Sequence, residues 1–129
     1  MATGLTFDTG ALIAAERSDR SGRLVWWFYE EAIERGGIVT VPAPALAQAW
    51  RGNSAPISRM LKGCDIEPLD ERIAKRAGQL LAKSHTADVI DAVVVVGAAI
   101  RGDAIVTSDR QDVERLVSAL KVDLRVLTI

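Results

Sequence analysis

Two aspartates come directly after short apolar segments and directly before helical ones. Asp8 follows the apolar segment 5–7, and Asp109 follows the segment 105–108. If both segments are parallel strands, their carboxyl ends meet at one edge of the sheet, where α/β folds build their sites. Each aspartate alone is also an ordinary helix N-cap. The repeat of this pattern in one short chain favours a shared carboxylate site.

Two further aspartates, Asp88 and Asp91, stand three residues apart at the start of an apolar segment. In a helix this spacing places both on one face, and the helix N-terminus partly compensates their charge. Gathered carboxylates repel one another unless a cation neutralises them, and Mg²⁺ or Mn²⁺ takes oxygen ligands. Asp112 is either a further metal ligand or a residue that stabilises the start of its helix.

Strand-like and helical segments alternate along the chain, which predicts an α/β fold with a central, mostly parallel sheet of four to five strands. The predicted strands cover 5–7, 38–41, 65–69, 104–107 and 124–129. The predicted helices cover 11–15, 23–35, 45–51, 56–62, 71–83, 86–101 and 111–120. Thr86 is the expected N-cap of the helix that ends at Arg101.

Length and composition indicate one globular domain over residues 1–129. The chain is 49% hydrophobic and 26% charged, which fits an ordinary core with a wetted surface. Its longest apolar run, 92–100, is well below the roughly 20 residues that span a bilayer. Asp8 interrupts the apolar start, so we expect no cleavable signal, a cytoplasmic protein and no membrane partner.

Charge is unevenly distributed although the net charge is only −1. Seven basic residues face four acidic ones between positions 51 and 83, and seven acidic residues face four basic ones between 88 and 123. An acidic centre beside a basic surface suits a metal site that faces a polyanion, and the same counts fit solvated helix faces. Cys64 and His85 supply too few ligands for structural zinc, and we interpret both as structural.

Four segments, taken in series, are similar to the PIN domain, and in particular to the VapC-type ribonuclease toxins of bacterial toxin–antitoxin pairs. They are FDTGALIA (7–14), VPAPALAQAWR (41–51), ADVIDA (87–92) and IVTSD (105–109). The resemblance covers nearly the whole chain, with the motifs in family order. It implies a PIN-like three-layer α/β/α sandwich whose acidic pocket binds Mg²⁺ or Mn²⁺ and hydrolyses RNA phosphodiester bonds.

The resemblance also assigns roles to individual residues. Asp8, Asp91 and Asp109 match the first, third and fourth acids of the pocket, and are expected to be catalytic and to bind the metal. Asp88 and Asp112 match extra acids that some members use as metal ligands. Thr107 and Ser108 match small polar residues that support the pocket from the strand end.

Gln48 departs from the family pattern, which usually has Glu at that position. A glutamine retains a carbonyl oxygen that can coordinate a metal or orient water, but it carries no negative charge. Metal binding would then be weaker, or would depend more on Asp88 and Asp112. Arg51 and Arg110 flank acidic positions and are candidates for holding the RNA backbone, because a guanidinium suits phosphate. Ordinary surface charge is the alternative interpretation for each.

The resemblance implies three partners: an RNA substrate, a cognate antitoxin protein, and a second copy in a homodimer. The aromatic cluster 26–29 is too dense for every ring to be in the core, so some rings are expected to meet a partner. We expect Trp26 or Trp27 to become protected when antitoxin binds. Glu16 lies about 12 Å along a helix from Asp8 and is interpreted as structural or as an interaction residue.

Two other functional classes remain as alternatives. A catalytically weak PIN-fold module that mainly binds a partner protein or RNA is motivated by Gln48. A phosphatase or receiver-like domain is suggested by Phe7-Asp8-Thr9, but it needs a second Asp where this chain has Gly10. Metal affinity, and the sensitivity of any cleavage to Asp8→Asn, separate the nuclease from the binding module.

Overall fold

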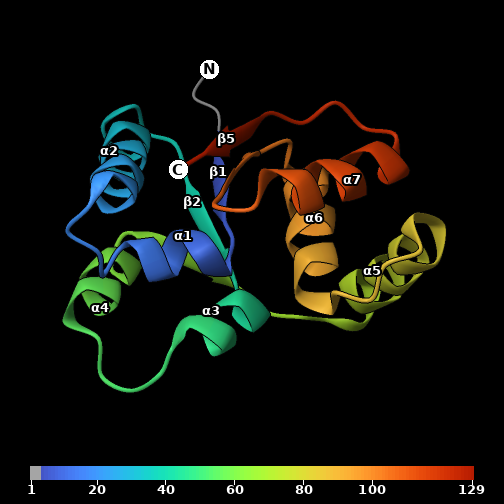
Figure 1. Cartoon of the computed structure of the whole chain (residues 1–129), viewed down its shortest axis with the longest axis horizontal. Coiled ribbons are helices and arrows are strands. Elements are labelled where there is room, and N and C mark those ends of the chain that lie inside the picture. Colours follow the sequence, from blue (N-terminus) through green and yellow to red (C-terminus); the bar gives the residue numbers. More distant parts are fainter. Residues whose placement is uncertain (1–3) are drawn as a thin grey trace.

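The computed structural model describes residues 4–129 and places the helices on both faces of a central sheet (Figure 1). The sheet has five strands in the order β3-β2-β1-β4-β5, and every neighbouring pair is parallel. The strands are β1 (Leu5–Phe7), β2 (Val39–Pro42), β3 (Cys64–Glu67), β4 (Ala104–Thr107) and β5 (Val126–Thr128). The predicted mostly parallel sheet is therefore confirmed.

Seven helices connect these strands in the described part of the chain. They are α1 (Thr9–Ala14), α2 (Arg20–Glu34), α3 (Ala43–Ala49), α4 (Ala55–Leu61), α5 (Glu71–Ser84), α6 (Val89–Arg101) and α7 (Arg110–Leu120). The helix predicted at 23–35 begins earlier, because the Asp19 side chain accepts the Gly22 N–H and caps α2 at its start. No helix within residues 4–129 combines the length and apolar character needed to cross a bilayer.

The predicted N-cap of α6 was wrong. Thr86 does not cap α6: its hydroxyl lies 2.8 Å from the Ser84 hydroxyl, in the turn that precedes the helix. Asp88 is the N-cap instead, and its carboxylate accepts the Asp91 N–H at 3.0 Å. Both residue types cap helices well, so the local sequence does not distinguish them.

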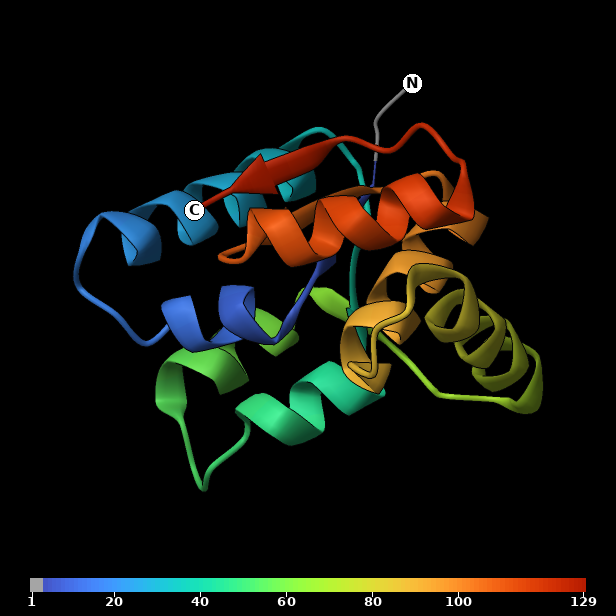
Figure 2. The ribbon, with the colours of Figure 1, turned by 45° about the vertical axis from the view of Figure 1, so that its right-hand side comes forward.

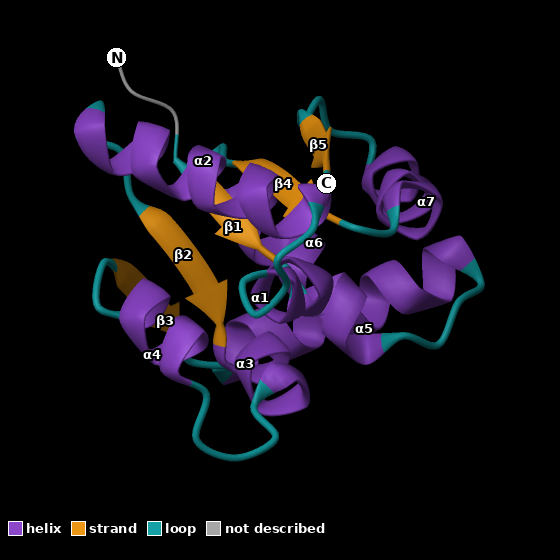
Figure 3. Cartoon of the chain, turned by 60° about the vertical axis from the view of Figure 1, so that its left-hand side comes forward, coloured by secondary structure: helices purple, strands orange, loops and turns teal. Residues whose placement is uncertain are grey.

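Side chains alternate in direction along each strand, so the core forms two layers, one on each face of the sheet. Leu5 and Phe7 face one side of the sheet and pack with α1, α2 and α4, whereas Ile105 faces the other side and packs with α5, α6 and α7. Figure 3 shows α5 and α7 together on one side of the sheet. Helix α6 is apolar nearly all round because it lies between the sheet and these two helices.

A polar network joins α6 to the sheet at the end of the helix. Arg101 Nη1 pairs with Glu67, its Nε donates to Asp103 Oδ2 at 2.8 Å, and its Nη2 donates to Thr6 Oγ1 at 2.9 Å. The Thr6 hydroxyl donates in turn to Asp103 at 2.8 Å. Glu67 Oε1 is buried without a hydrogen-bond partner among residues 4–129, and a Cβ at Gly97 would lie 2.5 Å from it. The network therefore fixes the position of α6, and Gly97 lets the helix come close to Glu67 in β3.

Candidate metal site at the carboxyl edge of the sheet

The two strand–Asp–helix motifs lie side by side, as the sequence predicts. Strand β1 pairs with β4 with Phe7 opposite Val106, so the chain leaves both strands at the same edge of the sheet. The Asp8 N–H donates to the Val106 carbonyl at 3.3 Å, which ties the first motif to the second strand. Asp8 and Asp109 are therefore neighbours although about a hundred residues separate them.

Asp8 is the most deeply placed acid at this edge, with only 4% of its surface exposed. Burial raises the pKa of its carboxyl, and hydrogen bonds from the Thr107 hydroxyl and the Ala11 N–H oppose the rise. The Ala11 N–H lies 2.9 Å from Asp8 Oδ1, so Asp8 also caps α1. Asp8 can therefore serve both as the N-cap of α1 and as a member of a carboxylate site.

Thr107 connects the two motifs through one hydroxyl. Its oxygen accepts the Asp109 N–H at 2.9 Å, and the same hydroxyl is hydrogen-bonded to the Asp8 carboxylate. A hydroxyl has one proton and two lone pairs, so it can accept from the first and donate to the second. Thr107 is completely buried and cannot leave this arrangement easily.

Asp91 carries the largest perturbation among these acids. Partial burial raises the pKa of its carboxyl to about 7, and the nearby charges of Asp88, Asp8 and Asp112 add to the rise. Its neighbours therefore come from the ends of β1 and the starts of α6 and α7. The end of β1 and the starts of α6 and α7 therefore bring their carboxylates close to one another at this edge of the sheet.

Asp109 and Asp112 complete the set at the start of α7. Asp109 occupies the N-cap position, but its side chain makes no capping hydrogen bond and remains exposed. A hydrogen bond with Asp109 raises the pKa of Asp112, and the charges of Asp109 and Asp88 act in the same direction. We call Asp8, Asp88, Asp91, Asp109 and Asp112 the acidic group, because each interacts with another member.

The acidic group is a set of carboxylates in mutual repulsion rather than a closed coordination shell. Within residues 4–129, no three acidic, histidine or cysteine side chains are arranged closely enough to hold one metal ion together. Direct coordination by several of them would need side-chain rotation, and ordered water can bridge the rest. The oxygen-only donor set is the one that Mg²⁺ and Mn²⁺ prefer.

Gln48 lies beside the acidic group on α3. Its Oε1 accepts a hydrogen bond from the Thr9 hydroxyl at 2.8 Å, and Thr9 is the first residue of α1, directly after Asp8. Figure 2 shows α1 and α3 side by side. The amide is exposed and its oxygen is partly committed to Thr9. Position 48 therefore adds polarity to the rim of the site but no charge.

Gly10 is a site residue that sequence reasoning missed. A Cβ at this position would overlap Ser108 Oγ, and would lie 3.1 Å from Ser108 Cβ and 3.5 Å from Asp8 Oδ1. The loop after β4 can approach α1 this closely only because position 10 has no side chain. The signal in the sequence was a glycine in the first turn of a helix, directly after a candidate ligand.

The Gly10→Ala variant should be less stable, by about 1–2 kcal/mol, because the new methyl group meets Ser108 and Asp8. In an unobstructed helix the same change stabilises by about 0.5–1 kcal/mol. Gly78 in α5 provides that matched control, since nothing lies within 4 Å of a Cβ there. Urea denaturation measures both variants. Equal gains in stability at the two positions would contradict the packing at Gly10.

Neither of the two basic candidates forms an ion pair with the acidic group within residues 4–129. Arg110 Nε donates to Glu114 at 2.9 Å, and its Nη1 contacts the Thr128 hydroxyl at 3.3 Å. Arg51 is exposed just after α3. Arg115, which the sequence interpretation did not single out, is the cation whose charge lowers the pKa of Asp112. Its spacing of three residues from Asp112 on one helix was the available signal.

The other residues considered from the sequence lie outside the site. His85 is the C-cap of α5 in the left-handed conformation, with φ of 56°. Cys64 lies in β3, its thiol donates to the Met60 carbonyl at 3.3 Å, and burial raises the pKa of the thiol to about 12. Glu16 is exposed after α1. These placements agree with structural roles for His85 and Cys64.

The aromatic cluster on α2 separates into inner and outer rings. Trp26 packs on the core layer, its Nε1 donates to the Ala15 carbonyl at 3.1 Å, and the Arg59 guanidinium lies 4.7 Å from its ring centroid. Trp27 is 54% exposed and contacts Phe28 edge to face at 5.3 Å. Trp27 is therefore the ring available to another molecule.

Comparison with protein-family models finds no match for this chain, and comparison with curated protein sequences finds none. Several solved structures are similar. FitAcB from Neisseria gonorrhoeae has a TM-score of 0.68 at 17% identity over 96% of both chains. VapBC2 from Rickettsia felis, bound to a DNA fragment from their promoter, has a TM-score of 0.67 at 11% identity over 97% of this chain and 98% of that one.

A toxin–antitoxin complex from Klebsiella pneumoniae has a TM-score of 0.57 at 21% identity, over 85% of this chain and 89% of the other. Identities at this level establish a shared architecture. The shared architecture extends over 96–97% of the chain in the first two of these structures. The predicted fold is thus confirmed: the chain is an α/β sandwich with a five-stranded parallel sheet, matching a PIN-like fold.

Proposed function

We propose that this chain is a metal-dependent endoribonuclease that acts as the toxin of a toxin–antitoxin pair. The observation that carries the proposal is the acidic group, in which β1, α6 and α7 direct five aspartates at one sheet edge. Raised carboxyl pKa values concentrate at functional sites. Helix capping accounts for Asp8 and Asp88, but it does not account for the partly buried Asp91, whose carboxyl pKa is raised by burial and by the charges of its neighbours.

A divalent cation fits this group on chemical grounds. Burial and mutual repulsion raise the pKa values of Asp8 and Asp91, and a bound cation would reverse both effects. Asp8, Asp91 and Asp109 would hold it, with Asp88 and Asp112 as outer acids. When bound, Mg²⁺ or Mn²⁺ supplies a water of lowered pKa and screens charge on the phosphate.

The protein's own residues prepare the site. Thr107 holds the Asp8 carboxylate and the Asp109 backbone in one orientation, and burial of Asp8 keeps water from solvating its charge. Asp91 retains its proton at the carboxyl up to about neutral pH. Binding of a cation there should therefore release protons, which is a signature independent of cleavage.

The similar structures support one of the partner assignments, the antitoxin. Two are FitAB and VapBC assemblies bound to DNA, and another is a toxin–antitoxin complex. We propose a cognate antitoxin as protein partner, RNA as substrate, and a homodimer as the assembled form. Arg51, just after α3, and Arg110, at the start of α7, are exposed and are proposed to contact the RNA backbone.

RNA cleavage by purified, antitoxin-free protein tests the function. Total tRNA and rRNA fragments are incubated with Mg²⁺, Mn²⁺ or a chelator, for the native chain, Asp8→Asn and the control Asp123→Asn. Asp123 is an exposed acid between α7 and β5, outside the acidic group. We expect cleavage that requires metal, falls at least about 100-fold in Asp8→Asn, and persists in the control. Cleavage that survives Asp8→Asn would reject the assignment.

A second candidate is a PIN-fold module that binds a partner but cleaves poorly. Gln48 supports it, since the amide adds no charge and is hydrogen-bonded to Thr9. The separation of the carboxylates supports it as well. Proton release and binding of Mn²⁺ without cleavage would favour this module, and cleavage gained by Gln48→Glu would identify position 48 as the cause.

Antitoxin binding should protect Trp27 rather than Trp26. Trp27 is exposed on α2, whereas Trp26 is already packed and hydrogen-bonded to Ala15. Acrylamide quenching of tryptophan fluorescence should fall when the cognate antitoxin is added, and Trp27→Phe should remove most of that change. An unchanged response in Trp27→Phe would place the antitoxin elsewhere on the surface.

A further inference from the structure

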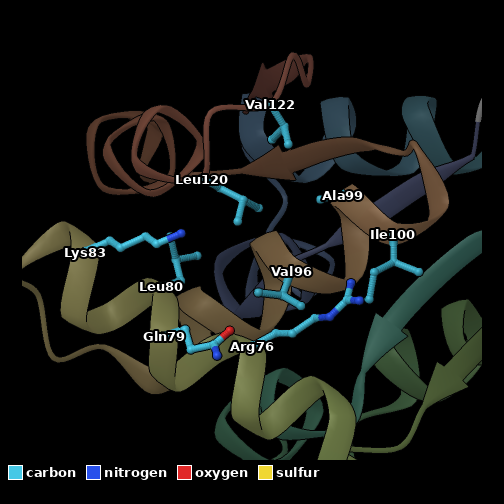
Figure 4. A pocket seen from close by; sticks show the side chains of 9 residues that line it. All are labelled: Arg76, Gln79, Leu80, Lys83, Val96, Ala99, Ile100, Leu120 and Val122. Carbon is cyan, nitrogen blue, oxygen red and sulfur yellow. The ribbon is translucent and has the colours of Figure 1, made fainter.

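An open groove of about 350 Å³ lies between α5, α6 and the segment that follows α7 (Figure 4). Its floor is apolar and includes Leu80 and Val96, which are almost fully buried. Two further apolar side chains reach solvent at its margin: Ile100 is 39% exposed and Val122 is 38% exposed. The groove therefore presents apolar surface that the described part of the chain leaves uncovered.

Basic side chains stand along one wall of this groove. Arg76, Gln79 and Lys83 follow one another at helical spacing on α5, as Figure 4 shows. Neither cation forms an ion pair with any residue in 4–129, although Lys75 on the same helix pairs with Glu71 at 2.6 Å. No acidic residue lines the groove; Asp123 follows Val122 but is not part of the lining.

This lining selects among possible occupants. An extended peptide strand would gain no backbone pairing, because no strand edge borders the groove. Single-stranded RNA would find cations but no aromatic ring on which to stack its bases. An amphipathic helix can place apolar side chains on the floor and carboxylates against the basic wall, matching the two-turn spacing of Arg76 and Lys83.

We propose that the α5–α6 groove docks an acidic amphipathic helix of a partner protein. Leucine-like side chains would cover Val96, Ile100 and Val122, and carboxylates would pair with Arg76 and Lys83. Apolar burial supplies affinity, and the unpaired cations supply selectivity for a negatively charged helix.

The groove is separate from the acidic group. Val96, the lining residue of α6 nearest to Asp91, is five residues beyond it, roughly 7.5 Å along the helix axis, and Ala99 is roughly 12 Å beyond it. An occupant of the groove can therefore bind while the carboxyl edge of the sheet stays open. The proposal does not depend on the nuclease function and can be tested without it.

Designed helical peptides provide the probe. They share one leucine stripe and differ only in flanking residues, which are Glu, Gln or Lys, and binding to the full chain is followed by fluorescence anisotropy. We expect the Glu peptide to bind at least about tenfold more tightly than the Lys peptide. The double substitution Arg76→Glu with Lys83→Glu should reverse that order, and Arg76→Gln with Lys83→Gln should abolish it.

Arg72→Glu with Lys75→Glu is the matched control, because it changes the same charge on the same helix outside the groove. This control variant should still bind the Glu peptide more tightly than the Lys peptide, as the native chain does. The proposal is overturned if no peptide binds, if the Glu and Lys peptides bind equally, or if the control reverses the preference. A last outcome also overturns it: the Glu peptide does not bind, and oligouridylate binds to the native chain but not to the Arg76/Lys83 variants.

Discussion

Asp91→Asn should lower RNA cleavage by at least about 100-fold and at the same time make the protein more stable at pH 8. These opposite effects have one cause. The Asp91 carboxylate is ionised at that pH despite burial and despite the charges of Asp88, Asp8 and Asp112. Removing the charge relieves the repulsion and removes a proposed metal ligand. A residue kept for stability alone would show a loss of both properties.

The size and pH dependence of the gain follow from the raised pKa. Folding raises the pKa of Asp91 from 3.8 to about 7, so the folded chain holds this proton more tightly than the unfolded chain. Stability should fall as pH rises from about 4 to about 7 and then level off. Because Asp91 is only half-buried, solvent screening reduces the gain in Asp91→Asn to about 1–2 kcal/mol at pH 8.

Urea denaturation at pH 4, 6 and 8 without metal measures this gain, and Asp123→Asn serves as the control. The stability difference between Asp91→Asn and the native chain should grow with pH, whereas that of the control should stay constant. Addition of Mg²⁺ should stabilise the native chain more than the variant, because binding to the folded state adds to its stability. A pH-independent loss of stability in Asp91→Asn would contradict the proposed electrostatic repulsion.

The largest loss of stability should come from Arg101→Met, about 2–4 kcal/mol, although the residue is remote from the candidate site. The guanidinium is the only cation that contacts the Glu67 and Asp103 carboxylates within residues 4–129, and the Asp103 side chain is just 7% exposed. Methionine retains much of the side-chain volume but leaves both carboxylates without a cation, and only the Thr6 hydroxyl still donates to Asp103. Such unpaired charges cost far more than an intact pair contributes.

Arg110→Met is the matched control for this effect. Arg110 also pairs with a glutamate at 2.9 Å, but both side chains are about half exposed. Water replaces the lost partner there, so we expect a change below about 1 kcal/mol. Urea denaturation near pH 7 compares the two variants, and similar losses would mean that water reaches the Arg101 network as well.

Local sequence was sufficient to predict the elements of the fold. Alternation of apolar strand segments with helical ones identifies an α/β sheet, and the position of Asp8 and Asp109 directly after strands identifies the functional edge. Helix starts were predicted less well, as Thr86 and Asp88 show, because several nearby side chains can each cap a helix. The strand predicted at 124–129 is confined to Val126–Thr128.

The composition of the candidate site was also predictable, but the role of each residue in it was not. All five aspartates of the acidic group were identified from the sequence, since carboxylates at strand and helix ends are a local pattern. Gln48 was identified only through the resemblance to the PIN domain. Thr107 was expected to support the pocket, yet its dual hydrogen bonding to Asp8 and Asp109 follows only from the pairing of β1 with β4. The close approach of Gly10 to Ser108 has the same origin.

The sequence by itself determined the class of fold, the acids and the edge at which they gather, because periodicity and strand ends are properties of neighbouring residues. Only the tertiary structure decided which charges interact and which surfaces remain uncovered. The contact between Thr6 and Asp103 spans 97 residues, and the groove beside Arg76 joins α5, α6 and the end of α7. Burial and electrostatic coupling depend on distances in space, which local patterns do not encode.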